Sequence, residues 1–150
     1  MNQKNGYSLI ELMIVMGIIA ILFSLSTLSF ANLNKQDQLD SLAAEIKLAI
    51  VQSQSQTVNG NPSGVYFENN RFIVFVGDQY TQGNPNSQIT DLPQGITFQN
   101  IQLPDNQINF LKITGYINNY VSPENFTLYD QETGRNRVFN LNRLGVIEIQ

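Results

Sequence analysis

A long run of apolar residues dominates the first quarter of the chain. Residues 12–34, which are 23 residues, contain no Asp, Glu, Lys or Arg. The run begins Leu-Met-Ile-Val-Met-Gly-Ile-Ile and continues through a Ser-rich stretch to Asn34. At 1.5 Å per residue such a helix is about 35 Å long, enough to cross a bilayer. The pattern therefore predicts a membrane-spanning helix.

Helical periodicity continues beyond this run. One apolar stripe has the spacing i, i+3, i+4, i+7, i+10 and i+11, and it consists of Leu39, Leu42, Ala43, Ile46, Ala49 and Ile50. Charged residues occupy the other faces, and no Pro occurs before Pro62. We expect one helix from about Ser8 to about Thr57, some 75 Å long, ended by the turn residues 59–62. Its stripe should pack against a sheet.

The remainder of the chain alternates between short β-type runs and turn residues. Strands are predicted at 65–67, 72–76, 96–98, 108–110, 126–129, 138–141 and 146–149. Asn69-Asn70 suits a two-residue hairpin turn because Asn tolerates positive φ, and residues 131–134 form a second turn. Residues 78–94 are polar and are expected to form a surface loop. The order of these elements predicts an α+β fold, with the long helix packed on antiparallel β-sheets of a small C-terminal domain.

The composition excludes several classes of chemistry. The chain has 150 residues, a formal net charge of −4, no Cys and no His. It therefore lacks thiolate chemistry, a disulfide framework, the commonest general base and the commonest zinc ligand. The acidic residues of the loops do not have the spacing of a calcium-binding loop. We expect no enzymatic activity, no metal and no cofactor.

A carboxylate inside the apolar N-terminal segment separates three interpretations of that segment. A removed secretory signal is one of them, since Lys4 gives a positive start and Ser29-Phe30-Ala31 fits a small-x-small cleavage site. An ordinary membrane anchor is the second. Glu11 argues against both, because a charge in a membrane helix costs about 3 kcal/mol at its centre and needs a partner.

The third interpretation is based on the residues around that carboxylate. The sequence Lys4-Asn5-Gly6-Tyr7-Ser8-Leu9-Ile10-Glu11-Leu12-Met13 closely resembles the class III signal of type IV prepilins and pseudopilins. The resemblance implies that prepilin peptidase cuts after Gly6 and methylates the new amine of Tyr7, where the family usually has Phe. It also implies that Glu11 meets the amine of an adjacent subunit during assembly.

This resemblance implies four segments. They are a leader (1–6), a transmembrane and filament-core helix (7–34), the amphipathic half of the same helix (35–58) and a β-rich globular domain (59–150). The implied partners are other pilins or pseudopilins, prepilin peptidase and the inner membrane. The protein would cross the inner (cytoplasmic) membrane once, with its globular domain outside the cytoplasm, and would enter a filament.

The layout of the whole chain is most similar to that of GspH/FimT-like minor pseudopilins. The motifs that carry this likeness are Gly64-Val65-Tyr66-Phe67, the segment 92–98 and the terminal segment 142–149. The implied function is a structural subunit, a minor pseudopilin or minor pilin, of a type II secretion-like or type IV pilus-like filament. The alternative from another class is a secreted β-rich binding domain whose leader is cut after Ala31.

One basic concentration raises the question of DNA. Gly134-Arg135-Asn136-Arg137 is followed closely by Arg143. FimT-like DNA-uptake pilins carry a Gly-Arg-x-Arg motif in the C-terminal region, so the resemblance makes a DNA-uptake pilin an alternative. The three arginines could meet if residues 126–149 form adjacent hairpins. The simpler interpretation is a solvated hairpin tip, and the negative net charge opposes binding to a polyanion.

Overall fold

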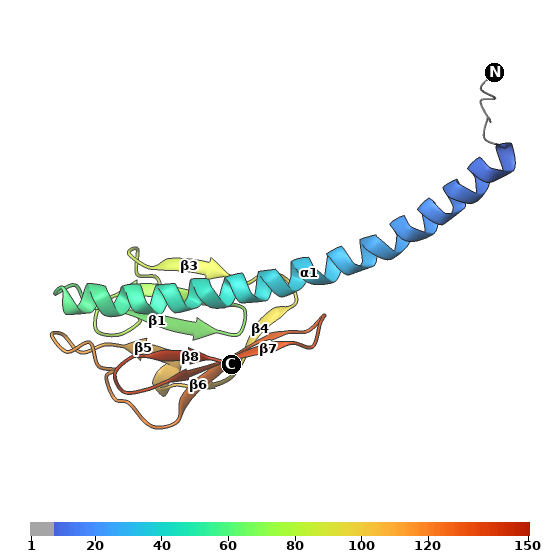
Figure 1. The fold of residues 1–150 in the computed structure, drawn as a ribbon. Coiled ribbons are helices and arrows are strands. Elements are labelled where there is room, and N and C mark those ends of the chain that lie inside the picture. Colours follow the sequence, from blue (N-terminus) through green and yellow to red (C-terminus); the bar gives the residue numbers. More distant parts are fainter. Residues whose placement is uncertain (1–7) are drawn as a thin grey trace, which may run out of the picture. The chain divides into compact units, whose positions relative to one another are not determined.

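A single long helix leads into a domain of short strands (Figure 1). The computed structural model describes residues 8–150, except for the side chains of residues 25–37. Helix α1 spans Leu9–Val58, which confirms the helix predicted from about Ser8 to about Thr57. The chain forms two units, the first ending at Gln38 and the second comprising Leu39–Gln150, and each is described separately.

The turn predicted after the helix ends α1. The N–H of Gly60 donates to the carbonyl of Thr57 at 3.1 Å, and the N–H of Asn61 donates to the carbonyl of Gln56 at 3.0 Å. Gly60 has φ +94°, a conformation that glycine adopts without steric cost. These bonds satisfy carbonyls that the last helical turn leaves open, so the chain can turn into the first strand.

Eight strands form two antiparallel sheets, and the α+β prediction is confirmed. The first sheet has the order β3-β2-β1-β5 and contains β1 (Ser63–Glu68), β2 (Arg71–Val76), β3 (Gln88–Asp91) and β5 (Gln107–Asn109). The second has the order β4-β6-β7-β8 and contains β4 (Ile96–Gln102), β6 (Glu124–Asp130), β7 (Asn136–Leu141) and β8 (Ile147–Ile149). A 3₁₀ turn, η1 (Pro104–Asn106), precedes β5.

The local turns agree with the sequence, whereas one predicted loop is wrong. Glu68 pairs with Arg71, which leaves Asn69-Asn70 as the two-residue turn between β1 and β2. The segment 78–94 was expected to be a surface loop, but it contains β3, which pairs with β2. This strand lies at the edge of its sheet and is largely exposed. An exposed edge strand buries no apolar face, so it leaves no alternating pattern in the sequence.

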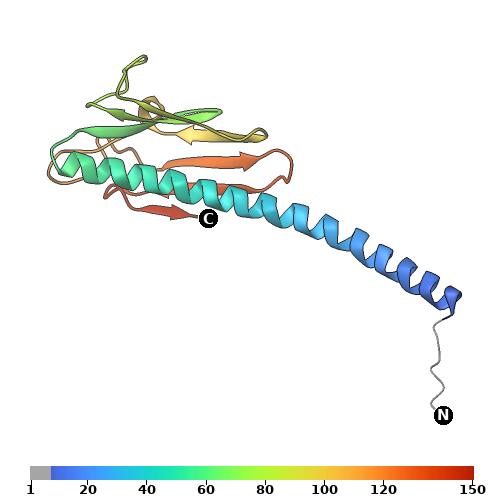
Figure 2. The same cartoon turned by 90° about the horizontal axis from the view of Figure 1, so that it is seen from above.

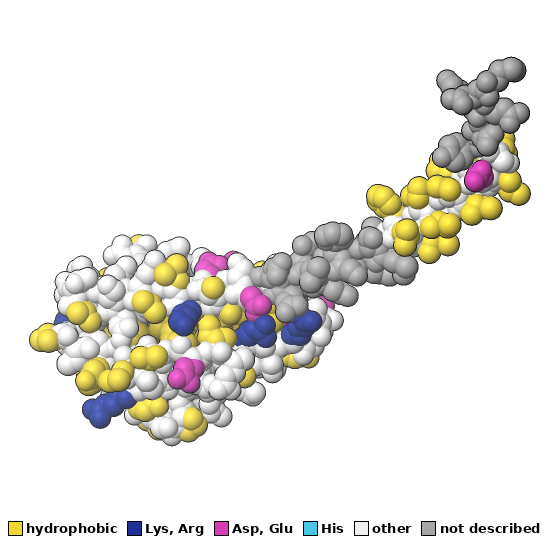
Figure 3. Space-filling view, viewed as in Figure 1, with side chains coloured by type: hydrophobic (Ala, Val, Ile, Leu, Met, Phe, Trp, Pro, Cys, Tyr) yellow, Lys and Arg dark blue, Asp and Glu magenta, His cyan; other side chains and the backbone are white. Residues whose placement is uncertain are grey.

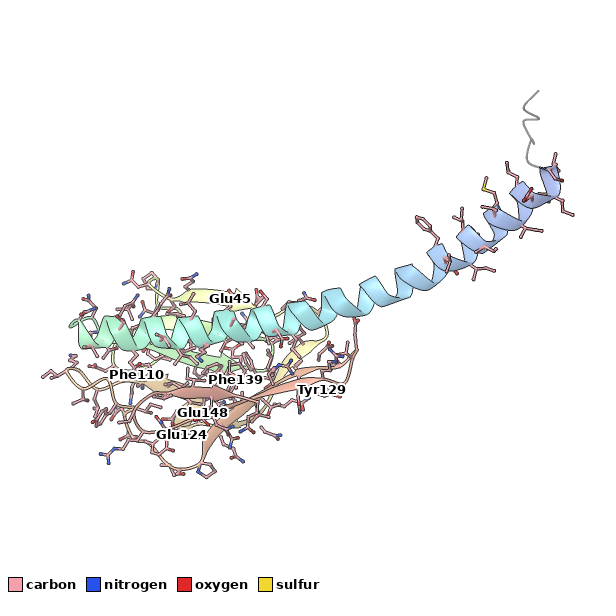
Figure 4. All side chains as sticks on the ribbon, in the orientation of Figure 1. Glu45, Phe110, Glu124, Tyr129, Phe139 and Glu148 are labelled. Carbon is pink, nitrogen blue, oxygen red and sulfur yellow. The ribbon has the colours of Figure 1, made fainter. Side chains whose placement is uncertain are left out.

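The core of the second unit lies between α1 and the two sheets. Figure 2 shows α1 running across strands of both sheets. Five of the six residues of the predicted stripe are buried and Ala49 is half-buried, which confirms that the stripe is core packing. Phe67 of the first sheet meets Phe126 of the second at a centroid distance of 4.6 Å. Phe126 in turn stacks on Phe139 at 4.5 Å (Figure 4 labels Phe139).

The buried stripe of α1 ends in two polar residues that the sequence pattern did not indicate. Ser53 and Thr57 are both fully buried. The Ser53 hydroxyl donates to the carbonyl of Ala49 at 2.9 Å. The Thr57 hydroxyl accepts the N–H of Ser63 at 2.9 Å and lies 2.9 Å from the carbonyl oxygen of Ser53. Because buried polar groups are costly without partners, these bonds let the helix end against the start of β1.

Candidate functional site

The described part of the first unit is a helix with apolar side chains on every face. All its described side chains, residues 8–24, are exposed within this chain, and the large apolar ones range from 48% exposed at Ile19 to 80% at Leu9. A helix that is apolar all round requires a surrounding membrane or other helices. These side chains are therefore an apolar surface that the described residues leave exposed.

Glu11 is the acidic residue of this surface. It lies in the first turn of α1, and Figure 3 shows a magenta acidic side chain among yellow apolar ones at that end. The helix begins with the N–H of Leu12 donating to the carbonyl of Ser8 at 3.2 Å. The first turn of a helix favours a carboxylate because its N–H groups carry partial positive charge. Gly6 and Tyr7, the predicted cleavage and methylation residues, lie outside the described residues.

The predicted membrane span falls only partly on described residues. In the part of the chain that the structure describes, no helix combines the length and the apolar character needed to cross a membrane. The predicted run of residues 12–34 includes 25–34, whose side chains are not described.

Among the three arginines of the basic concentration, Arg137 is held in an ion pair. Its Nε and one terminal nitrogen lie 2.7 and 2.6 Å from Oδ1 of Asp40. Successive side chains of a strand point to opposite faces of its sheet. In β7, Arg137, Phe139 and Leu141 share the face that meets α1. Arg137 therefore fastens β7 to the first turn of α1 within the domain. The sequence did not indicate this pairing, since 97 positions separate the two residues.

The other two arginines do not form one site with Arg137. Arg135 lies in the turn between β6 and β7, whereas Arg143 follows the opposite end of β7. The predicted hairpins are present, since β6, β7 and β8 pair consecutively. The distance from Arg137 to the end of β7 at Leu141 is already about 13 Å at 3.3 Å per residue. The expected cross-strand meeting of all three arginines is therefore wrong.

A buried carboxyl group, Glu124, lies at the start of β6 (Figure 4). Only 2% of the residue is exposed. Its Oε1 accepts the backbone N–H of Val121 at 3.0 Å. Burial raises the pKa of Glu124 above its ordinary value, and the hydrogen bond from Val121 opposes this effect in part. Through this hydrogen bond, Glu124 holds the preceding loop to the second sheet.

Gln54 is a connecting residue that the sequence analysis missed. Its side-chain amide donates to the carbonyl of Gly115 at 2.7 Å and to the carbonyl of Leu144 at 2.9 Å. Gly115 lies in the loop between β5 and β6, and Leu144 lies in the turn before β8, so Gln54 connects both segments to α1. A lone Gln among several in the helix gives no pattern from which this role could be predicted.

Comparison with known proteins identifies the N-terminal segment and the fold. Residues 1–27 match the family model described as the prokaryotic N-terminal methylation motif. No curated protein sequence matches the chain. Among solved structures, the minor pseudopilin EpsH from the type 2 secretion system of Vibrio cholerae is similar, with a TM-score of 0.53 and 12% identity. The match covers 75% of this chain and 96% of EpsH.

These two findings agree with each other. The motif covers the first helical segment, and the structural likeness extends over most of the chain. At this level of identity the structural match establishes the fold. The chain thus carries a prokaryotic N-terminal methylation motif and has a fold similar to that of a minor pseudopilin.

Proposed function

We propose that the chain is a structural subunit, a minor pseudopilin or minor pilin, of a type II secretion-like or type IV pilus-like filament. The observation that carries the proposal is the combination of a methylation motif at residues 1–27 with a domain that has the minor-pseudopilin fold. One helix, α1, connects them. Its uncovered apolar residues provide a surface for the inner membrane before assembly and for other subunits afterwards.

Processing prepares the N-terminus for assembly. Prepilin peptidase cuts after Gly6, so Tyr7 carries the new amine and Glu11 lies one helical turn further along. The Glu11 carboxylate then pairs with the amine of a neighbouring subunit. At 4 Å and an effective dielectric constant near 20, such a pair gains about 4 kcal/mol before desolvation is subtracted. Since either charge alone is costly in apolar surroundings, the pair favours one stagger of subunits over others.

The processing step is tested by intact-mass analysis of the membrane fraction. We expect loss of residues 1–6 and the addition of one methyl group. Replacing Gly6 with a bulky residue should leave the full-length chain, because the peptidase can no longer cut. A mature N-terminus at Asn32 would instead support the secreted alternative, which requires a cut after Ala31.

The assembly role of Glu11 is tested by Glu11→Gln in cells that lack the native copy. The variant should reach the membrane at the normal level but fail to enter the filament, because the amine of the neighbour loses its partner. Glu45→Gln is the matched control, since Glu45 is an exposed glutamate of the same helix within the domain (Figure 4). Normal incorporation of Glu11→Gln would remove the assembly role.

The DNA-uptake alternative receives less support. Arg137 is committed to Asp40, and Arg143 lies beyond the far end of β7. Arg135 is then the remaining cation of the Gly-Arg-x-Arg run. A single phosphate contact gives only weak binding, because the electrostatic affinity grows with the number of phosphates neutralised. A gel shift with duplex DNA at low salt, repeated with Arg135→Gln/Arg137→Gln, would revive this function if the wild type binds and the variant does not.

A further inference from the structure

An exposed apolar surface lies at the end of the domain where α1 finishes. Three segments contribute to it: the end of α1, the loop between β5 and β6, and the turn before β8. We call this surface the apolar pole, and its residues are Val58, Leu111, Ile113, Tyr116, Leu144 and Val146. In Figure 3 yellow side chains gather at this end, with a blue cationic side chain beside them. Phe110, labelled in Figure 4, marks the same end from within the core.

The apolar pole is held rigidly. Phe110 and Ile117 form a β-bridge, and the N–H of Leu111 donates to the carbonyl of Tyr116 at 2.8 Å. Gln54 then ties this loop and the turn at Leu144 to α1. A rigid apolar surface requires little ordering when it binds.

Ile113 lies at the tip of that loop in a strained conformation. Its φ is +77°, in the left-handed region that is rare for a β-branched residue. The residue is also 87% exposed, so its side chain contributes little to the core. Asn or Gly would fit this backbone with less strain. An isoleucine that costs backbone energy and faces solvent points to a binding role.

The charges around the apolar pole are mainly positive. Lys112 lies in the same loop, and its Nζ is 3.9 Å from Oδ1 of Asp78, with both side chains mostly exposed. An exposed pair at this distance is weak. Arg143 adjoins Leu144 and is not in an ion pair with any described carboxylate. A partner surface that complements the apolar pole is therefore apolar at its centre and carries carboxylates at its edge.

A second copy of this chain does not present that surface at either end of its domain. Contact between two apolar poles would bring the Lys112 and Arg143 cations of both copies into one interface, which like-charge repulsion opposes. At the opposite end, the described turns at 69–70 and 131–135 contribute no exposed large apolar side chain. Head-to-tail stacking would leave Ile113 without an apolar partner.

We infer that the apolar pole docks a different subunit of the same filament, one whose contact surface is an apolar hollow edged by carboxylates. Ile113 enters the hollow, and Lys112 and Arg143 meet the carboxylates. This inference rests on the proposed function. It specifies a contact at the domain, separate from the helix contacts made through Glu11. A membrane with anionic lipids also combines apolar and negative groups, but a single exposed isoleucine flanked by one cation in its loop and one in the neighbouring turn fits a protein hollow better than a broad lipid surface.

The test uses the full-length chain in cells that produce the filament. A photo-cross-linking amino acid replaces Thr114, an exposed residue next to Ile113. The expected product is an adduct with another chain that carries an N-terminal methylation motif. Ile113→Asn should reduce its amount about tenfold or more, because burying such a side chain contributes at least one order of magnitude in affinity. Arg143→Glu should also reduce it, whereas Ile89→Asn, which removes an exposed isoleucine from β3, should not.

The midpoint of thermal unfolding separates a binding role from a structural one. Ile113→Asn should leave it unchanged or raise it, because the strain at this position is relieved. The inference would be overturned by a lower midpoint of Ile113→Asn or by an adduct whose amount does not change in that variant. An adduct of two copies of this chain, or an adduct with lipid, would also overturn it. If leader removal and Glu11-dependent incorporation succeed while Ile113→Asn has no effect, only this inference fails. If the leader is not removed, the proposed function itself fails.

Discussion

The ion pair between Arg137 and Asp40 provides a quantitative test of how the domain holds its helix. The two nitrogens of Arg137 lie 2.6 and 2.7 Å from one carboxylate oxygen. Charges about 4 Å apart would gain roughly 4 kcal/mol at an effective dielectric constant of 20. The side chains are 27% and 47% exposed, so water screens the pair and much of that gain is lost. We expect a coupling free energy of about 1 kcal/mol, at the upper end of exposed pairs.

A double-mutant cycle measures this coupling. Asp40→Asn, Arg137→Gln and the double variant are unfolded with urea as full-length chains in detergent, with circular dichroism as the signal. The free energies of unfolding should be non-additive by about 1 kcal/mol. At 1 M NaCl the coupling should fall clearly, because the Debye length shortens to about 3 Å. Arg137→Lys should retain only part of it, since lysine lacks the planar fork.

Two results would refute this reasoning. Additive free energies would mean that the pair contributes nothing to holding β7 against α1. A coupling that does not change with salt would mean that its origin is packing of the arginine stem rather than charge. Asp40→Asn also tests the DNA alternative, because it releases Arg137. Stronger DNA binding by Asp40→Asn would show that the ion pair masks a nucleic-acid contact.

Three further predictions concern the second unit, and each is checked by unfolding of the full-length chain. Glu124→Gln keeps an acceptor for the Val121 N–H but removes the charge. Because burial raises the pKa of Glu124, its favourable contribution is complete below the ordinary pKa and is lost as the pH rises through the raised value. The variant should therefore gain stability relative to the wild type towards pH 7 and lose that advantage near pH 4, and an advantage that is independent of pH would contradict this. Gly145→Ala should lower the free energy of unfolding by about 2–4 kcal/mol. Gly145 has φ +77°, and the new Cβ would lie 2.5 Å from the amide nitrogen of Gln54, so both hydrogen bonds of that amide would break. A loss below about 1 kcal/mol would show that the amide moves freely. Ile46→Ala should cost about 2–5 kcal/mol, because it opens a cavity at the centre of the buried stripe, and a smaller loss would mean that the sheets close onto the helix.

The elements that sequence reasoning identified depend on local signals. The helical stripe repeats with a constant period over Leu39–Ile50, and the Asn69-Asn70 turn needs only two residues and their flanking strands. The N-terminal motif is also local, which is why it could be recognised within about 20 residues. In contrast, β3 was missed because an exposed edge strand has no buried face to mark it.

The same local signals could not predict how segments far apart in the sequence are arranged. The division of the strands into two sheets depends on contacts between segments far apart, such as the pairing of β4 with β6. The link between Arg137 and Asp40 follows from that arrangement, so the arginine run was assigned to a possible DNA site instead. Gln54 and Ile113 have the same character, since only the folded loops explain why one is bonded twice and the other is strained.

The buried stripe of α1 has a mechanical consequence. Within the domain, Leu39, Leu42, Ile46 and Ile50 are spaced along the helix axis and are all buried against the sheets. Tension applied at Leu39 along that axis loads these contacts in shear, so they share the force and must slip together. Peeling the helix away sideways would instead break them one after another at lower force. The domain is therefore built to resist a pull directed along the part of the helix that it buries.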